Sequence, residues 1–465
     1  MTGATAADGV LPVRLVGDDV AVPCVDGQDR VYVSFDAAAS TSSLPAVAER
    51  VRQFVPWYSS VHRGAGWKSQ LATQQYEEAR AAALTFAGPT RTDDVAIVCR
   101  NTTEAINHLA YRLALRPDDV VVTTVVEHHA NLLPWARVAT RRYVECDRRG
   151  TFAEDDVAAA LDTEPRPKLL AVTGASNVTG WMPPLDPVIA AAHERGVPVL
   201  VDAAQLAPHR PLPAGADYVA WSGHKMYAPF GAGILVGPRA LFATGEPFLA
   251  GGGAVDLVDL DEVVWTDPPD REEAGSPNVM GAVALHAAID EFGRIGWDAI
   301  ARHDDAMSMQ MREGLAAIDG VRVLGEVGEG ALPVLTFVVE DVPHALVAAR
   351  LSAEHGIGVR HGCFCAHPYL LRLLDLRPDQ VAEYRAAVLR GDRRRVPGAV
   401  RASAGLSTTA DDVDRLLAAV AGIASGDPPV VPYVQDEATG DYWPMTPHPA
   451  WADAQRRVGA SCARG

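Results

Sequence analysis

The chain has 465 residues, 48% of them apolar, and a formal net charge of −18 at neutral pH. This length is enough for a large domain and a smaller second one, and the acidic charge argues against nucleic acid or an anionic membrane surface as the main partner. No window holds the roughly 20 apolar residues of a membrane-spanning helix, and we see no secretion signal at the start of the sequence. The six cysteines are too scattered for a disulfide framework. We therefore expect a cytoplasmic protein.

The middle of the chain alternates short apolar runs, which predict strands, with helix-like segments. Apolar strands separated by helices indicate an α/β fold with a largely parallel sheet covered on both faces. Ligands of such sheets bind beyond the carboxyl ends of the strands, so the polar residues that end the runs are candidates for one shared site. The runs are VAIVC from Val95, VVVTTVVEH from Val120, LLAVTGAS from Leu169, PVLVDAAQ from Pro198, YVAWSGHK from Tyr218 and GAGILVG from Gly231.

A helix at about 282–295 leads into a second domain. This domain is predicted to contain helices near 307–318 and 345–355, the strands VRVLG and LPVLTFVV, and a last helix at 409–423. The segment after it is rich in proline and tryptophan, which is typical of an extended tail that lies on the body. We therefore expect an N-terminal segment that packs with the small domain (1–33), a large domain (34–295), a small domain (296–427) and a tail (428–465).

Two residues with complementary chemistry follow strands of the large domain. Asp202 ends the run PVLVD, and Lys225 follows the run YVAWS. A carboxylate at the end of a buried strand is costly unless a cation or a hydrogen bond meets it. The pair suits pyridoxal phosphate, because the aspartate keeps the pyridine nitrogen protonated while the lysine forms an imine with the cofactor. These two residues alone leave open a buried ion pair with no cofactor.

Further polar residues lie at the ends of two other strands. Asn101, Thr102 and Thr103 separate a strand from a helix, so free amides and two hydroxyls face outward at a helix N-terminus, as in phosphate sites. His128 follows another strand, where an imidazole can stack on a flat heteroaromatic ring. Taken singly, the first motif is an ordinary helix cap and His128 a structural histidine. Four strand ends that converge on one chemistry favour the cofactor site.

Six motifs occur in order along the chain: VHRG from Val61, NTTEAIN from Asn101, EHHAN from Glu127, SNV from Ser176, VDAAQ from Val201 and SGHK from Ser222. Together they resemble the motifs of the SUF-type cysteine desulfurases, which belong to the class V aminotransferase group of fold-type I pyridoxal-phosphate enzymes. The resemblance extends from about residue 32 to residue 423. It implies a large domain with a mostly parallel seven-stranded sheet and a smaller C-terminal α+β domain.

The resemblance also implies how a pyridoxal 5'-phosphate cofactor is held. Lys225 is the imine lysine and the proton shuttle between the substrate α-carbon and the cofactor. Asp202 pairs with the pyridinium nitrogen, and His128 stacks on the ring. The other implied cofactor contacts are Thr102, Thr103, Asn177, Gln205, Ser222, His224 and, from the neighbouring subunit, Ser276.

Substrate recognition and assembly follow from the same resemblance. Arg401 aligns with the arginine that clamps the substrate carboxylate, and a guanidinium fork suits a carboxylate because it binds both oxygens. His62 and Asn177 are the other implied substrate contacts. Because Ser276 is expected to complete the site of the partner, the resemblance implies a symmetric homodimer.

The loop 359–366 resembles the family's active-site loop and places Cys365 at its nucleophilic cysteine. In a desulfurase, the protein thiolate takes the sulfur of L-cysteine, or of a cysteine-derived substrate, as a persulfide and leaves alanine; a sulfur-acceptor protein is the partner that this implies. Arg360 and His361 are candidates to favour the thiolate. Cys363 stands where SUF-type enzymes usually carry histidine, and the sequence GCFC is closer to the molybdenum-cofactor sulfurase-like members. No metal site is expected, because the CFC pair has no second cluster of ligands nearby.

Other departures leave alternatives open. The insertion 368–398 is longer than usual and basic near 390–395, so it reshapes the entrance, receives a partner or is simply a solvated helix pair. Ser407-Thr408-Thr409 replaces an expected YNT. One alternative is a class V aminotransferase, epimerase or C–S β-lyase of specialised metabolism without persulfide chemistry. Another is a non-catalytic binding protein that has kept the fold.

Overall fold

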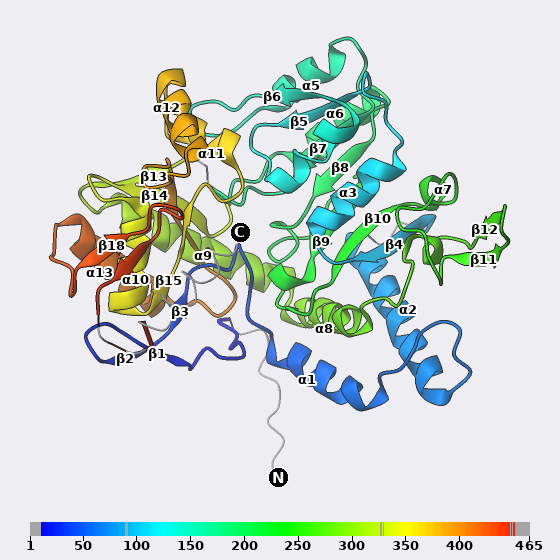
Figure 1. The fold of residues 1–465 in the computed structure, drawn as a ribbon, viewed down its shortest axis with the longest axis horizontal. Coiled ribbons are helices and arrows are strands. Elements are labelled where there is room, and N and C mark those ends of the chain that lie inside the picture. Colours follow the sequence, from blue (N-terminus) through cyan, green and yellow to red (C-terminus); the bar gives the residue numbers. More distant parts are fainter. Residues whose placement is uncertain are drawn as a thin grey trace.

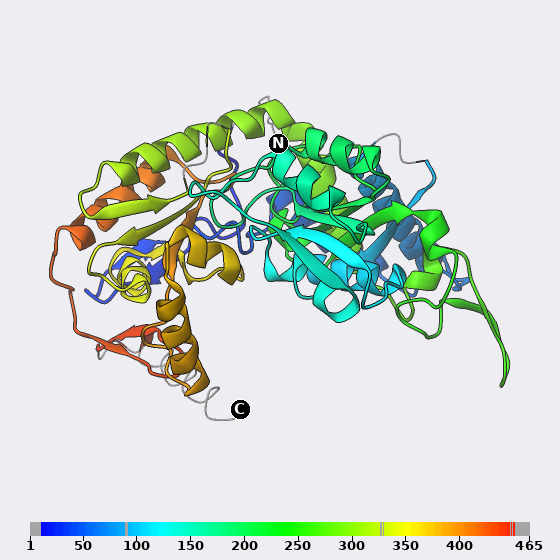
Figure 2. The same ribbon diagram turned by 90° about the horizontal axis from the view of Figure 1, so that it is seen from above.

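The computed structural model describes residues 11–88, 92–325, 328, 330–446, 448 and 450–451. The ends of the predicted N-terminal segment and tail, residues 1–10 and 452–465, lie outside these ranges. Two sheets stand side by side, a larger one and a smaller one, and the long helix α9 (Trp297–Ala316) runs across the smaller one (Figures 1 and 2). In the described residues, none of the helices has the length and apolar character needed to cross a membrane.

The larger sheet has seven strands in the order β4-β10-β9-β8-β7-β5-β6. Five of them, from β9 to β6, are joined by parallel pairings, whereas β10 runs antiparallel to both β9 and β4. The mostly parallel seven-stranded sheet that the resemblance implies is therefore confirmed. The strands are β4 (Asp94–Cys99), β5 (Val120–Thr124), β6 (Thr140–Val144), β7 (Leu169–Thr173), β8 (Val199–Asp202), β9 (Tyr218–Ser222) and β10 (Gly233–Pro238).

Helices cover both faces of this sheet, which is why its central strands are apolar throughout. Alternate strand residues face opposite layers: Val121 packs with the α3 side, and Val122 packs with the other side. The first layer contains α3 (Thr102–Arg112), α4 (Trp135–Val138) and α7 (Arg239–Phe242). The second contains α1 (Pro45–Phe54), α2 (Trp67–Ala87), α5 (Glu154–Asp162), α6 (Leu185–Glu194) and α8 (Val279–Ile295).

The smaller sheet is antiparallel, in the order β13-β14-β17-β16. Its strands are β13 (Val321–Leu324), β14 (Val334–Val339), β16 (Arg360–Gly362) and β17 (Ala399–Ser403). It shares a core with α9, α10 (His344–His355) and α13 (Ala410–Ala424). Val33, the last residue of the predicted N-terminal segment, and Phe35, just beyond it, join this core, and strand β3 (Val33–Ser34) pairs with β15 (Ile357–Gly358). Helix α9 begins ten residues before the predicted start at Met307, because its first turns also lie against α8.

Several shorter elements lie at the periphery. The insertion forms α11 (His367–Leu373) and α12 (Pro378–Leu389), and no residue of α12 is buried. The tail forms a hairpin of β18 (Tyr433–Gln435) and β19 (Tyr442–Pro444), because Gly440, with φ of 80°, permits a tight reversal. A second hairpin, β11 (Val255–Val258) and β12 (Val263–Trp265), projects from the opposite end of the molecule (Figures 1 and 2). The remaining small elements are β1 (Ala21–Pro23), β2 (Asp29–Val31) and the 3-10 turns η1 (Val55–Trp57), η2 (His129–Asn131), η3 (Gly223–Lys225) and η4 (Asp270–Glu272).

Candidate active site

A cavity of about 320 Å³ lies at the carboxyl ends of β8 and β9, beside the start of α3, and is closed on its other side by residues of β16 and β17. Its position is the one expected of a ligand site in a parallel sheet. The predicted residues that line it are Thr102, Thr103, His128, Asn177, Asp202, Gln205, Ser222, His224, Lys225, Cys365 and Arg401. Side chains from distant parts of the chain therefore converge on one space.

Asp202 and Lys225 are the charged pair of this cavity. Burial lowers the pKa of Lys225 to about 8, and the negative charge of Asp202 opposes that decrease. Burial also raises the pKa of Asp202, against a hydrogen bond from the Ala204 amide (3.0 Å) and the charge of Lys225. A lysine with this pKa is partly neutral near physiological pH, as an amine that exchanges protons or attacks a carbonyl must be.

The start of α3 forms a donor-rich end of the cavity. Asn101 caps the helix by accepting a hydrogen bond from the Glu104 amide (3.0 Å). The amide of Thr102 donates to Ser222 Oγ (2.8 Å), and the two hydroxyls lie 2.6 Å apart. Gly233 on β10 is required here, since a Cβ would lie 2.5 Å from the Cα of Asn101. Hydroxyls at a positive helix end suit a phosphate.

A flat neutral ring and an unpaired acceptor lie next to the charged pair. Nδ1 of His128 accepts a hydrogen bond from the Ala130 amide (3.0 Å), which leaves the proton on Nε2. Burial, followed by the charge of Lys225, lowers the pKa of His128 to about 3, so the ring is neutral. Oε1 of Gln205 is buried and has no partner among the described residues. An orphaned buried polar atom of this kind fits a bound group with a polar edge, and together these residues fit pyridoxal phosphate.

The loop that carries Cys365 is tied to the larger sheet. The carbonyl of Cys365 accepts a hydrogen bond from the His129 amide (2.7 Å), and the carbonyl of Phe364 accepts one from Asn177 Nδ2 (2.8 Å). Phe364 and Cys365 both have φ of 54°, in the left-handed region that non-glycine residues seldom adopt. The side chain of Cys365 is exposed and lines the cavity, whereas Cys363 is half-buried and burial raises its pKa.

Arg401 contributes a buried guanidinium group to the wall of the cavity. Its side chain is 2% exposed, and burial lowers its pKa to about 10 against the opposing charge of Asp36. Nη1 donates to the carbonyl of Asn177 (3.0 Å), Nη2 donates to Asp36 Oδ1 (2.9 Å), and the guanidinium lies over the ring of Phe364 at 5.2 Å. Nε is buried and has no partner among the described residues. A buried guanidinium with a free donor at a cavity wall can bind a carboxylate.

Comparisons with known proteins agree with this geometry. The family model "Aminotransferase class-V" matches residues 33–416. The chain belongs to the class V aminotransferase family. Its relatives include a protein named cysteine desulfurase from Dickeya dadantii, 36% identical over 85% of this chain and 92% of the relative, and one named probable cysteine desulfurase from Vibrio cholerae, 34% identical over 85% of this chain and 94% of the relative.

Solved structures give the same result. The apo cysteine desulfurase of Thermococcus onnurineus has a TM-score of 0.75 and 31% identity, covering 85% of this chain and 95% of its own. A cysteine desulfurase of Escherichia coli has a TM-score of 0.72 and 32% identity, covering 84% and 94%. This member of the class V family is thus similar to cysteine desulfurases over most of its length.

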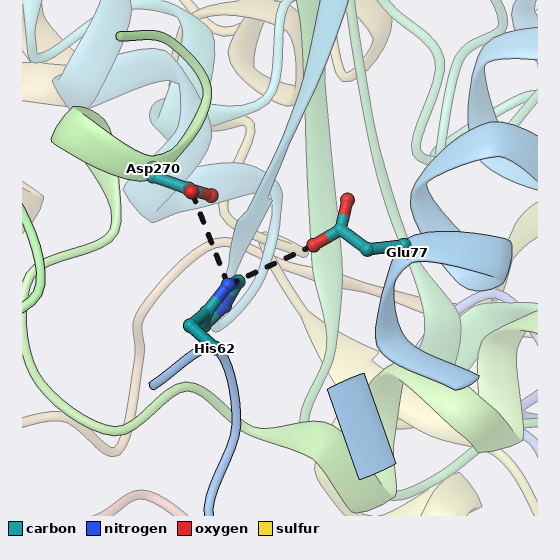
Figure 3. A group of neighbouring side chains, drawn as sticks. All are labelled: His62, Glu77 and Asp270. Carbon is teal, nitrogen blue, oxygen red and sulfur yellow. Dashed lines mark ion pairs between the residues drawn. The ribbon is translucent and has the colours of Figure 1, made fainter. Parts of the chain in front are cut away.

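Two predicted site residues of this class V enzyme do not line the cavity of their own chain. Ser276, predicted to act in the neighbouring subunit, lies in the loop that leads into α8. His62 instead faces two carboxylates, with Nδ1 3.9 Å from both Glu77 Oε1 and Asp270 Oδ2 (Figure 3). Arg80 already bonds the same carboxylates at 2.9 and 2.7 Å, so a cation there would compete with a buried guanidinium.

Two residues that support the site from outside the cavity were given no role in the sequence analysis, and one candidate lies elsewhere. Asp36, which pairs with Arg401, follows the two-residue strand β3, too short to give a strand signal. Glu127 is buried and joins β5 to β7 by accepting a hydrogen bond from the Thr173 amide (2.9 Å). His361, considered as a group that favours the thiolate, pairs instead with Asp441 of the tail (3.2 Å), whereas Arg360 does line the cavity.

Proposed function

We propose that this chain is a pyridoxal-phosphate-dependent cysteine desulfurase that transfers the sulfur of L-cysteine, or of a cysteine-derived substrate, to Cys365. The observation that carries the proposal is that Lys225, Arg401 and an exposed Cys365 line one cavity. An amine, a carboxylate clamp and a thiol are the three groups that the reaction needs. The names of the relatives support the same activity.

When bound, the cofactor supplies an electron sink that weakens the bonds at the substrate α-carbon and thereby the C–S bond. The chain's own groups hold it in place. Asp202 would supply the counter-charge to the ring nitrogen, His128 would stack on the ring, and Thr102 with Ser222 would offer hydroxyls to the phosphate. Lys225 holds the cofactor and moves the proton at the substrate α-carbon, for which its lowered pKa is suited.

Arg401 and Cys365 complete the reaction on the substrate side. Arg401 holds the α-carboxylate in the same cavity that Cys365 lines, so that the side-chain sulfur of the substrate lies within reach of the exposed thiol. The thiolate of Cys365 attacks that sulfur: an S–S bond forms, the C–S bond breaks, and the carbon fragment is protonated to alanine. The outer sulfur atom of the persulfide then passes to a sulfur-acceptor protein, the S–S bond breaks, and the Cys365 thiolate is regenerated.

The test compares Cys365→Ser with the matched variant Cys363→Ser. We expect Cys365→Ser to keep the absorbance of the bound cofactor but to lose sulfide release from L-cysteine, because serine forms no persulfide. Cys363→Ser should keep most of the release. Mass spectrometry of wild type after incubation with L-cysteine should find one added sulfur atom on Cys365. Undiminished sulfide release by Cys365→Ser would exclude the persulfide role and favour a C–S β-lyase without it, whereas an aminotransferase would release no sulfide even as wild type.

We also propose a homodimer. The hairpin β11–β12 projects without a second layer, and its apolar side chains face outward, with Leu260 99% and Leu257 61% exposed. A lone two-stranded hairpin with an apolar surface requires a partner to cover it. Arg63, beside His62, holds the base of the hairpin by donating to the Val255 carbonyl (2.6 Å), which puts this predicted substrate loop at the same face.

We propose a cytoplasmic location as well, because the free described cysteines suit a reducing compartment.

A further inference from the structure

Asp36 lies between two guanidinium groups at the edge of the cavity. Its Oδ1 accepts a hydrogen bond from Arg401 Nη2 (2.9 Å), and its Oδ2 accepts one from Arg360 Nη2 (2.8 Å). Arg360 Nε lies 3.1 and 3.2 Å from the two oxygens, so this pair is bidentate. Arg360 and Arg401 line the cavity, whereas Asp36 does not. Any effect of Asp36 on a ligand therefore acts through the two arginines.

The three side chains form a series from the interior to the solvent. Arg401 is 2% exposed, Asp36 24% and Arg360 48%. The backbone around Asp36 is fixed to the strand that carries Arg401: the amide of Ala37 donates to the Ser403 carbonyl (3.3 Å), and the amide of Ala38 donates to Ser403 Oγ (3.0 Å). Asp36 is thus held in place independently of its ion pairs and can position both guanidinium groups.

The positive and negative charges of Arg360, Arg401 and Asp36 do not cancel. Two guanidinium groups and one carboxylate leave one net positive charge at the wall where the substrate carboxylate binds. Nη2 of Arg401 is bonded to Asp36 and Nη1 to the Asn177 carbonyl, whereas Nε has no partner among the described residues, so an incoming carboxylate binds Nε and shares Nη2 with Asp36. A ligand with one carboxylate neutralises the group, whereas a second anionic group on the same ligand finds no free positive charge.

We propose that Asp36 is a specificity-determining residue: it sets the charge of the carboxylate subsite to one, so that the site prefers amino acids with a single anionic group over those with two. The inference rests on the proposed function, because it takes Arg401 as the carboxylate clamp. Removal of the Asp36 charge leaves two unpaired guanidinium groups, and the second one then becomes available to a side-chain carboxylate.

The experiment uses the holoenzyme and two amino acids that carry one and two carboxylates, L-alanine and L-aspartate. Each is titrated while the absorbance of the bound cofactor is followed, and the ratio of the two apparent Kd values is compared between variants. We expect Asp36→Asn to shift the ratio toward L-aspartate by about tenfold or more. Asp36→Glu should keep the wild-type ratio. Asp36→Asn combined with Arg360→Gln restores one net charge and should return the ratio to within about threefold of wild type.

The matched control is Glu145→Gln, which removes a carboxylate from a similar bidentate pair with Arg372 outside the cavity. It should leave the ratio unchanged. The proposal is overturned if Asp36→Asn weakens both amino acids by the same factor, as loss of a merely structural ion pair would, or if the double variant shifts the ratio as far as Asp36→Asn. Failure of the proposed function looks different: wild type would then show no spectral response to any amino acid and no sulfide release.

Discussion

Lys225 must reduce the stability of the folded apo protein, because its pKa is about 8 in the fold against 10.5 for an exposed lysine. At about 1.4 kcal/mol for each pH unit, this difference corresponds to about 3 kcal/mol of stability that is absent below pH 8 and present above pH 10.5. The sign follows from proton binding: between these values the unfolded chain holds the proton and the folded chain does not, so stability rises with pH.

The clean comparison is Lys225→Met in an Asp202→Asn background, where no unpaired carboxylate remains. Because Asp202 raises the pKa of Lys225, its absence lowers that pKa further, and the stabilisation by Lys225→Met at pH 7 should be at least about 3 kcal/mol. Urea unfolding of both apo proteins between pH 7 and 10.5 measures it. The gain should shrink as the pH rises from 8, and the exposed Lys168→Met should change stability by under about 0.5 kcal/mol. A gain that is absent at pH 7, or independent of pH, would refute the reasoning.

Two further predictions concern packing and assembly. Glu354 and Arg350 form a buried pair whose side chains are 3% and 8% exposed. Glu354→Ala should therefore lower the free energy of unfolding by about 3 kcal/mol, whereas Glu145→Ala, in an exposed pair, should lower it by under about 1 kcal/mol. Equal losses would show that burial does not decide the effect. If the proposed dimer forms through this hairpin, replacement of Leu257 and Leu260 by glutamate should halve the mass measured by light scattering, with the secondary structure unchanged. An unchanged mass would contradict the proposed contact.

The strands of the larger sheet could be predicted because both their faces are buried, which leaves apolar runs in the sequence. The strand β6 escaped prediction because it is the edge strand and reads TRRYV, with only Val144 buried. The start of α9 was placed too late for a related reason: its first turns carry Asp298 and Arg302, so the apolar pattern becomes clear only near Met307. An apolar sequence pattern arises where side chains are buried, so a half-exposed element leaves only a weak pattern in the sequence.

The site could be predicted as far as its residues end strands or belong to long motifs. Asp202 and Lys225 were found in this way. Asp36 was not, because its pairing with Arg401 and Arg360 joins residues more than 300 positions apart, and no local pattern encodes such a contact. His62 shows the converse: its motif predicts a substrate contact, but within its own chain the backbone directs it toward Glu77 and Asp270.

The anchoring of the cysteine loop has a consequence for sulfur delivery. Because the carbonyls of Phe364 and Cys365 are bonded to Asn177 and His129, the backbone cannot swing outward without breaking both contacts. Only rotation about the side-chain bonds of Cys365 then moves a carried sulfur atom, over a few ångströms. If the proposed sulfur transfer takes place, the acceptor protein has to bring its own nucleophile to Cys365 at the cavity, because the loop cannot carry the sulfur out to it.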